Sequence, residues 1–300
     1  MKRVVSVSLG TPRRDGTSEV ELLGETVRVE RRGTDGDVDR AEALIRELDG
    51  NVDAIGLGGV DVYLEVGGDR YPIADGVRLR DAARRTPVVD GHGLKDTLER
   101  RVVEDLARAG RVGPGTRVLM VSALDRFGMA QALTEAGCTM VFGDVIFTTG
   151  MDYPVTTLEE LGKLARRVLP QLARLPHGML YPTGARQEEA PDERFARYFE
   201  AADLVAGDIH FIMRYLSGRA HGLTVLTNST TESDRASLAR RGVRSLVTTT
   251  PVFQGRSYGT NVVEAMLVAR LGPGAGPERY MELLDRVGLE PGSFDLEVSR

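Results

Sequence analysis

One lysine of this chain stands among groups that could orient it for chemistry, in the segment VVDGHGLKD at residues 88–96. Of the 39 basic residues only three are lysines, which leaves 36 arginines. Lysine, unlike arginine, can release its proton when its surroundings lower its pKa. A lysine that a carboxylate holds in place can transfer a proton to or from a substrate hydroxyl. We therefore predict Lys95, Asp90 and His92 as a catalytic set, with a solvated first turn of a helix as the alternative.

Polar residues also follow the apolar run RVLMVSA at residues 117–123, where a nucleotide site would keep its phosphate-binding turn. The three glycine positions of such a turn fall on Ala123, Asp125 and Gly128, of which only the last is glycine. Asp144 follows Ala123 by 21 residues, close to the separation of about 20 at which an acidic residue holds the ribose. Arg126 could offset the repulsion between Asp125 and a pyrophosphate.

These spacings predict NAD as the cofactor and make NADP a weaker choice, because a carboxylate at Asp144 would repel the 2′-phosphate. The alternative for Asp144 is that its strand continues through VFGDVIF and leaves this residue at a bend. The residues that we predict to bind the cofactor are Ser122, Asp125, Arg126, Phe127, Gly128, Asp144, Asn228 and Thr230.

A third polar set crowds a loop that leads into an apolar helix, in PVFQGRSYGTNVVEA at residues 251–265. An arginine just before a helix N-terminus suits a carboxylate or phosphate, because the guanidinium and the free amides both favour anions. We predict that Arg256, Thr260 and Asn261 bind the substrate. Two similar clusters, GLGGVD at residues 56–61 and YPTGARQE at residues 181–188, are equally explained as turns.

Composition and charge exclude several classes of protein. The single cysteine excludes an internal disulfide, and the four histidines show no metal-ligand spacing, so we expect no metal. The net charge of −5 argues against nucleic acid as the main partner. No apolar run reaches the roughly 18 residues of a membrane helix, and MKRVVSVSL is typical of a strand rather than of a signal peptide. We therefore expect a cytoplasmic protein with a small-molecule substrate, of a size compatible with a homodimer.

The elements that would position these residues fall into two groups. Residues 1–110 contain short alternating strands such as VVSVSL and ETVRVE beside helices, which predicts a smaller N-terminal mixed α/β substrate domain. The segment RVGPGT is the predicted boundary. Over residues 111–300 apolar strands alternate with helices, which predicts a parallel, doubly wound, Rossmann-like nucleotide-binding domain. Its last helices could pack back on the N-terminal domain.

Four motifs resemble a family of bacterial proteins known as quinate 5-dehydrogenases, within the shikimate and quinate dehydrogenases. The motifs cover most of the chain, and they are VVDGHGLKDTLERRVV, VLMVSALDRFGMAQAL, VLTNSTTESD and LVTTTPVFQGRSYGTNVVEAMLVA. The resemblance implies an N-terminal substrate domain followed by a nicotinamide-binding domain. The Asn-Val-Thr…Lys and Asn-Thr-Asp motifs that carry the catalytic residues of those enzymes are missing here. The role of Lys95 is therefore a prediction from the residues alone.

Together these interpretations predict an α/β, NAD(P)-dependent oxidoreductase that transfers a hydride between a nicotinamide cofactor and a hydroxylated ring acid such as quinate or shikimate. The altered phosphate turn favours an alternative, a Rossmann-like protein without redox activity that binds a nucleotide or a small metabolite. A transferase or lyase that uses the same sheet for a different nucleotide is a third interpretation.

Overall fold

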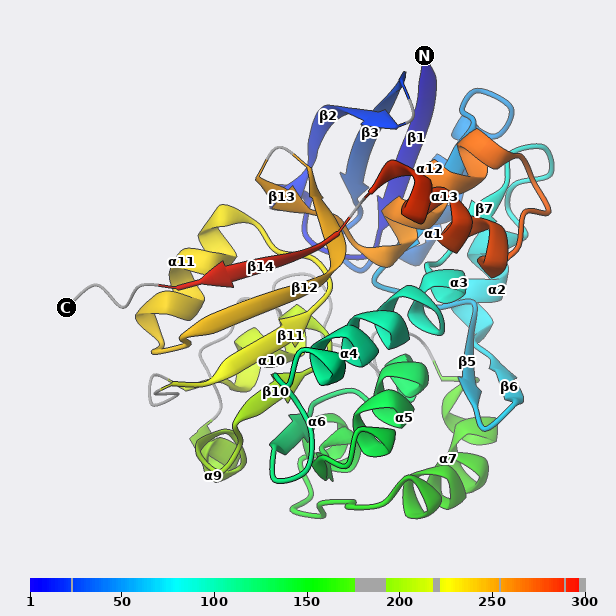
Figure 1. Cartoon of the computed structure of the whole chain (residues 1–300). Coiled ribbons are helices and arrows are strands. Elements are labelled where there is room, and N and C mark those ends of the chain that lie inside the picture. Colours follow the sequence, from blue (N-terminus) through cyan, green and yellow to red (C-terminus); the bar gives the residue numbers. More distant parts are fainter. Residues whose placement is uncertain (23, 176–192, 218–221, 254, 289, 297–300) are drawn as a thin grey trace. The chain divides into compact units, whose positions relative to one another are not determined.

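The computed structural model describes residues 1–22, 24–175, 193–217, 222–253, 255–288 and 290–296 (Figure 1). These residues form two compact units. The first unit takes the described parts of Met1–Leu94, Val168–Gln187 and Gly259–Leu289, and the second those of Lys95–Arg167, Glu188–Tyr258 and Glu290–Arg300. Helices near the C-terminus therefore belong to the same unit as strands near the N-terminus. The predicted boundary near residue 110 stays a prediction for independently folding domains.

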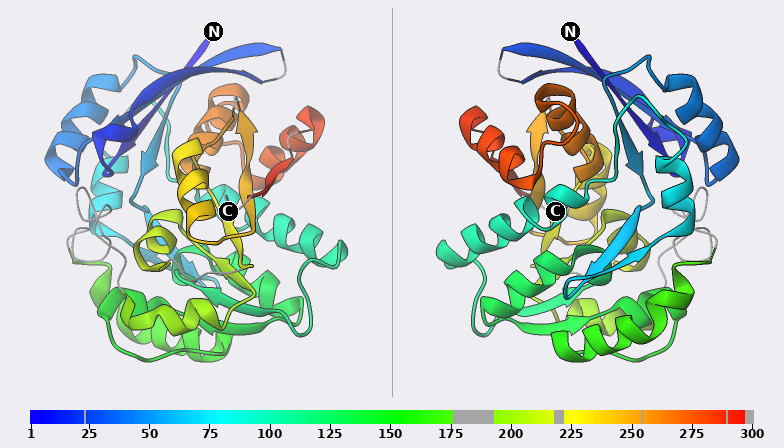
Figure 2. Two further views of the ribbon diagram at one scale, coloured as in Figure 1. Left: turned by 90° about the vertical axis from the view of Figure 1, so that its left-hand side faces the viewer. Right: turned by 90° about the vertical axis from the view of Figure 1, so that its right-hand side faces the viewer.

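A five-stranded sheet forms the centre of the first unit, in the order β2-β3-β1-β4-β7. Its strands are β1 (Lys2–Ser8), β2 (Gly16–Leu22), β3 (Glu25–Gly33), β4 (Ala54–Gly58) and β7 (Val88–Val89). β1 lies between β3 and β4 and is parallel to both, β7 extends the parallel part, and β2 closes one edge antiparallel to β3 (Figure 2). A separate hairpin joins β5 (Tyr63–Val66) to β6 (Asp69–Pro72).

Helices cover both faces of this sheet. They are α1 (Val38–Leu48), α2 (Ala74–Arg80), α12 (Thr260–Leu271) and α13 (Pro277–Val287), with the 3-10 turn η1 (Pro12–Arg14) and the short α3 (His92–Lys95). Val5 and Val7 of β1 share one buried core with Ile45 of α1. Ser6, between them, points to the opposite face, because successive side chains of a strand alternate. There it accepts a hydrogen bond from Asn261 of α12 at 3.1 Å.

The second unit contains a seven-stranded sheet with a parallel centre, in the order β13-β12-β11-β10-β8-β9. Its strands are β8 (Arg117–Met120), β9 (Thr139–Phe142), β10 (Leu204–Ala206), β11 (Thr224–Thr227), β12 (Ser245–Phe253), β13 (Arg256–Ser257) and β14 (Pro291–Asp295). The pairs β9–β8, β8–β10, β10–β11 and β11–β12 are all parallel. β13 and β14 both pair antiparallel with β12, and β14 follows it closely in Figure 1.

Helices precede and connect these strands. They are α4 (Leu98–Arg108), η2 (Leu124–Arg126), α5 (Phe127–Glu135), α6 (Asp144–Thr149), α7 (Leu158–Leu172), η4 (Glu193–Phe195), α9 (Ala196–Glu200), α10 (Ile209–Tyr215) and α11 (Glu232–Arg240). α11 starts with a capping box, in which Thr231 accepts the amide of Asp234 and the Asp234 side chain accepts the amide of Thr231.

The chain is thus a mixed α/β protein of two parts, as its sequence predicts at this level. Each part has a largely parallel sheet, which was predicted only for the second. The antiparallel strand β14 was not predicted, because Pro-Gly-Ser at its start lacks an alternating apolar pattern. Among the described residues, no helix combines the length and the apolar character that crossing a bilayer requires.

Candidate functional site

The loops after β8 and β10 meet in the second unit through Ser122 and Asp208. Ser122 follows β8, and its hydroxyl accepts a hydrogen bond from the backbone amide of Asp208 at 3.2 Å. Asp208 is the N-cap of α10, and its carboxylate accepts the amide of His210 at 2.8 Å. The ends of two neighbouring parallel strands therefore share one small polar region.

A buried ion pair lies beside this region, between Arg126 of the β8 loop and Glu99 of α4. The Arg126 side chain is 3% exposed and that of Glu99 is fully buried. Glu99 Oε1 also accepts a hydrogen bond from the Thr249 hydroxyl of β12 at 3.3 Å. Burial raises the pKa of Glu99, and the charge of Arg126 opposes this effect. Burial lowers the pKa of Arg126, but the charges of Glu99, Asp125 and Asp208 outweigh burial and raise it.

Lys95 forms a second ion pair with Asp125, in which the lysine side chain is 5% exposed and the aspartate 11%. The Arg126 guanidinium links the two pairs, with Nε 3.6 Å from Asp125 Oδ2 and Nη2 3.7 Å from Asp208 Oδ2. The Asp208 side chain is the most open of these groups, at 24% exposed. We call these five residues the charged cluster: Lys95, Glu99, Asp125, Arg126 and Asp208.

Asp144 occupies the turn that follows β8. Its two carboxylate oxygens accept the backbone amides of Ala123 at 3.1 Å and Leu124 at 2.9 Å. Burial raises the pKa of Asp144 to about 6, although the two amides act in the opposite direction. The strand ends at Phe142, so the alternative of a continuing strand is wrong. The backbone amides that would take a pyrophosphate are bonded to a carboxylate of the chain itself.

The other residues predicted to bind a cofactor serve the local fold. A Cβ at Gly128 would lie 3.1 Å from Asp96 Cα, so glycine here permits close packing of α5 on the start of α4. Phe127, half-buried, begins α5. The buried hydroxyl of Thr230 bonds to Ser257, and the carbonyl of Asn228 accepts the Thr250 hydroxyl at 3.0 Å.

The predicted catalytic set is divided between the two units, with Asp90 and His92 in the first and Lys95 in the second. The Asp90 carboxylate accepts the amides of Val62 at 2.7 Å and of His92 at 3.0 Å. The His92 ring lies against Tyr63, with 4.1 Å between ring centroids. Asp90 and His92 thus shape a loop of the first unit.

The predicted substrate residues are also divided. Arg256 belongs to the second unit and lies over the Tyr258 ring at 5.3 Å. Thr260 and Asn261 begin α12 in the first unit, where Thr260 is buried and Asn261 bonds to Ser6. Their role in ligand binding stays a prediction. The segment YPTGARQE and two histidines, His177 and His221, lie outside the described residues.

Sequence reasoning missed two buried carboxylates. Glu99 sits in the charged stretch LERRVVEDL, where nothing but its burial distinguishes it from its neighbours. Glu264 had a signal, because it is the one charged residue within NVVEAMLVA. In the first unit its Oε2 accepts the amide of Gly91 at 2.7 Å, and the carboxylate also accepts the amide of Gly93. Burial and the nearby charge of Asp90 raise the pKa of Glu264 to about 7.

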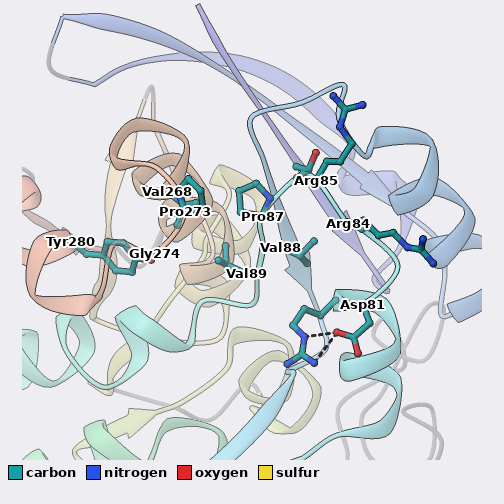
Figure 3. Close-up of a pocket in the computed structure, with 13 residues that line it drawn as sticks. Asp81, Arg84, Arg85, Pro87, Val88, Val89, Val268, Pro273, Gly274 and Tyr280 are labelled. Carbon is teal, nitrogen blue, oxygen red and sulfur yellow. Dashed lines mark hydrogen bonds and ion pairs between the residues drawn. The ribbon is translucent and has the colours of Figure 1, made fainter.

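The first unit also has an open surface pocket of about 470 Å³ (Figure 3). Tyr280 and Val268 line it beside Val89 of the edge strand, and Arg80 and Asp81 form an ion pair at 2.8 Å in its lining. The side chains of Arg84 and Arg85 point away from Tyr280 in Figure 3. None of the predicted site residues lines this pocket.

The chain is thus a two-part α/β protein with a cluster of paired charges beside the loops after β8 and β10. The chain belongs to the family described as Domain of unknown function (DUF8754), whose model matches residues 93–296. A second model, Domain of unknown function (DUF8753), matches residues 3–90. A comparison with curated proteins finds no match.

Solved structures align with the chain at low similarity. A solute-binding protein of an ABC transporter from Burkholderia multivorans has 12% identity and a TM-score of 0.40, and covers 98% of this chain and 99% of its own. GanP, a glucose-galactose binding protein from Geobacillus stearothermophilus, has 10% identity and a TM-score of 0.39, covering 98% and 97%. The periplasmic binding protein of the arabinose ABC transporter from Shewanella sp. ANA-3 has 9% identity and a TM-score of 0.36, covering 95% of each chain.

These findings correct the predicted identity. The resemblance to quinate 5-dehydrogenases is wrong, because the family models that match the chain describe domains of unknown function. The predictions of an oxidoreductase, of hydride transfer and of NAD or NADP as cofactor are wrong with it. The structure supplies the physical reason, because Asp144 already bonds to the amides of the predicted pyrophosphate turn.

Proposed function

We propose that this chain is a non-redox binding protein for a small, neutral, polyhydroxylated molecule, held at the charged cluster of the second unit. The proposal includes a doubly wound, Rossmann-like arrangement of the five parallel strands. Their order across the sheet is β9-β8-β10-β11-β12. The chain goes from β8 to β9 on one side and then to β10 on the other side of β8, so the order reverses at β8. In open parallel sheets, ligands bind beyond the carboxyl ends of the strands where the order reverses. The loops after β8 and β10, which carry Asp125, Arg126 and Asp208, lie at that position.

The observation that carries the proposal is the preformed pairing of Lys95 with Asp125 and of Arg126 with Glu99, beside the more open Asp208. Carboxylates accept hydrogen bonds, whereas ammonium and guanidinium groups only donate them. A hydroxyl group does both, so neighbouring hydroxyls of one ligand can bond to alternating acceptors and donors.

The charge of the cluster selects against anions. Three carboxylates surround two cations, so the cluster carries about one net negative charge when all five groups are ionised. A phosphate or carboxylate of a ligand would meet Asp125 and Asp208, and like charges at close range repel. A polyhydroxylated molecule without charge avoids this repulsion, which is why we favour it over a nucleotide.

Isothermal titration calorimetry with aldoses, polyols and cyclitols tests the proposal, with hexose phosphates and NAD as charged comparisons. We expect at least one neutral compound to bind and the phosphorylated compounds to bind more weakly. Asp208→Asn should weaken that binding by roughly tenfold or more, because hydrogen bonds to charged groups are worth about 1.5–3 kcal/mol.

Asp203→Asn is the matched control, because Asp203 pairs with Arg117 at the start of β8, away from the strand ends that carry the cluster. This variant should bind like the wild type. Equal binding by Asp208→Asn and the wild type, or no binding by any neutral compound at millimolar concentration, would refute the proposal. The predicted cytoplasmic location stays a prediction.

A further inference from the structure

The turn after β8 has the geometry of an anion site, and Asp144 fills it. Ala123 and Leu124 are successive residues, and both backbone amides point at the same carboxylate, at 3.1 and 2.9 Å. Successive free amides at the start of a helical segment after a parallel strand are the groups that bind phosphate in many proteins. Here the anion comes from the start of α6, 20 and 21 residues further along the chain.

Three features fix the carboxylate in this place. Asp144 is 9% exposed, so little water competes for its oxygens. It is the first residue of α6, directly after β9, and β9 pairs in parallel with β8. The end of one strand therefore delivers its carboxylate to the turn at the end of the neighbouring strand.

We propose that Asp144 is a specificity-determining residue, which holds the anion position of the β8 turn from within the chain and thereby excludes phosphorylated ligands. The inference goes beyond the proposed function and does not depend on it, because it concerns the turn itself whatever the protein binds. A phosphate that approached this turn would have to displace the Asp144 carboxylate from the two amides.

The protonation state of Asp144 agrees with this role. Its pKa of about 6 leaves the carboxyl mainly ionised at pH 7, despite burial, which raises this pKa. The two amides lower it and so favour the charged form. A charged group that depends on two amides leaves those amides without a partner when its side chain is removed.

The test is to vacate the position and supply an anion from solution. Asp144→Ala should unfold at a lower temperature than the wild type. Inorganic phosphate or formate at about ten times its dissociation constant should raise the melting temperature of the variant by about 3 °C more than that of the wild type. Chloride at equal ionic strength should have a smaller effect. Asp203→Ala, which removes an exposed carboxylate of the same unit, should respond like the wild type.

A direct readout separates binding from general stabilisation by salt. The ³¹P resonance of phosphate should broaden with Asp144→Ala and remain sharp with the wild type. If Asp144→Ala does not fold, Asp144→Ser decides, because its shorter side chain also leaves room for an anion and can still accept one amide. A folded variant whose melting temperature and phosphate resonance both match the wild-type response would overturn the inference. Sugar binding plays no part in either measurement, so the proposed function can fail without affecting it.

Discussion

Two buried carboxylates, one in each unit, solve the same structural problem in different surroundings. Asp144 accepts the amides of Ala123 and Leu124, the N-cap and the first residue of η2 in the second unit. Glu264 accepts the amides of Gly91 and Gly93 around the start of α3 in the first unit. In both places a side chain from a distant helix satisfies two backbone donors of a turn.

The turns themselves differ. The turn at Glu264 is built from glycines, with Gly91 at a φ of 94°, and a Cβ at Gly93 would lie 2.5 Å from Glu264 Oε1. The turn at Asp144 carries ordinary side chains and lies in the loop that supplies Asp125 and Arg126. One carboxylate therefore closes a tight turn, whereas the other borders the charged cluster. The difference teaches that a buried carboxylate bonded to backbone amides does not by itself indicate a ligand site. It does so only where other charged or polar side chains lie beside it.

The largest expected effect tests how much the buried ion pair of the charged cluster contributes to the free energy of unfolding. Arg126→Met should reduce the free energy of unfolding by about 3–5 kcal/mol, because Glu99 would stay buried without a counter-charge. The double variant Arg126→Met, Glu99→Leu should recover most of this loss, since it leaves no unpaired charge. Urea unfolding measures both variants. Arg117→Met, which breaks an exposed pair with Asp203, should reduce the free energy of unfolding by about 1 kcal/mol or less. An equal loss in Arg117→Met and Arg126→Met would contradict the difference between a buried and an exposed pair.

The pH dependence of stability should distinguish the two buried carboxylates. Each has a folded-state pKa above its ordinary value, 3.8 for Asp144 and 4.5 for Glu264, so each favours folding most at low pH. That stability is lost as the pH rises through about 6 for Asp144 and about 7 for Glu264. A shift of about two pKa units corresponds to about 3 kcal/mol.

The measurement is urea unfolding from pH 4 to pH 8 for the wild type, Asp144→Asn and Glu264→Gln. Relative to each variant, the free energy of unfolding of the wild type should fall by about 3 kcal/mol from pH 4 to pH 8. The loss should be nearly complete by about pH 6.5 against Asp144→Asn and should continue to about pH 7.5 against Glu264→Gln. Parallel pH profiles for all three proteins would show that neither carboxyl group is shifted.

The smallest expected effect compares two glycines. Gly93→Ala should destabilise the protein by about 1–3 kcal/mol, because the new methyl group would displace the Glu264 carboxylate from its amides. Gly128→Ala should change stability by about 1 kcal/mol or less. Its Cβ would lie 3.0–3.3 Å from Asp96 and Lys95, contacts that small shifts relieve, and alanine favours the helix. Thermal unfolding ranks the two variants. A larger loss of stability in Gly128→Ala than in Gly93→Ala would contradict the view that the turn at Glu264 is the tighter of the two.

The sequence predicts much of the fold because its signals are local. Alternating residues mark β1, apolar runs mark β8 and β12, and helical spacing marks α1. It does not predict β14, whose pairing with β12 depends on contact across the sheet. It offers the packing of the last helices on the N-terminal part only as an option, and the structure assigns α12 to the first unit. Those features are decided by residues far apart in the chain.

The candidate site shows the same limit. Lys95, Asp125, Arg126 and Asp144 all stand out by type and position, yet their partners do not follow from spacing. Lys95 and Asp125 are 30 residues apart. The spacing of a nucleotide turn is present with only one of its three glycines, Gly128, and the side chain predicted to hold a ribose bonds to the turn instead.

The return of the chain to its first unit has a consequence for synthesis. α12, which lies against β1, β4 and β7, begins at Thr260, long after those strands have left the ribosome. Until then, the sheet face that includes Ser6 lacks its apolar cover. The N-terminal strands must therefore wait, with one face open to water and to chaperones, while most of the polypeptide is still being made.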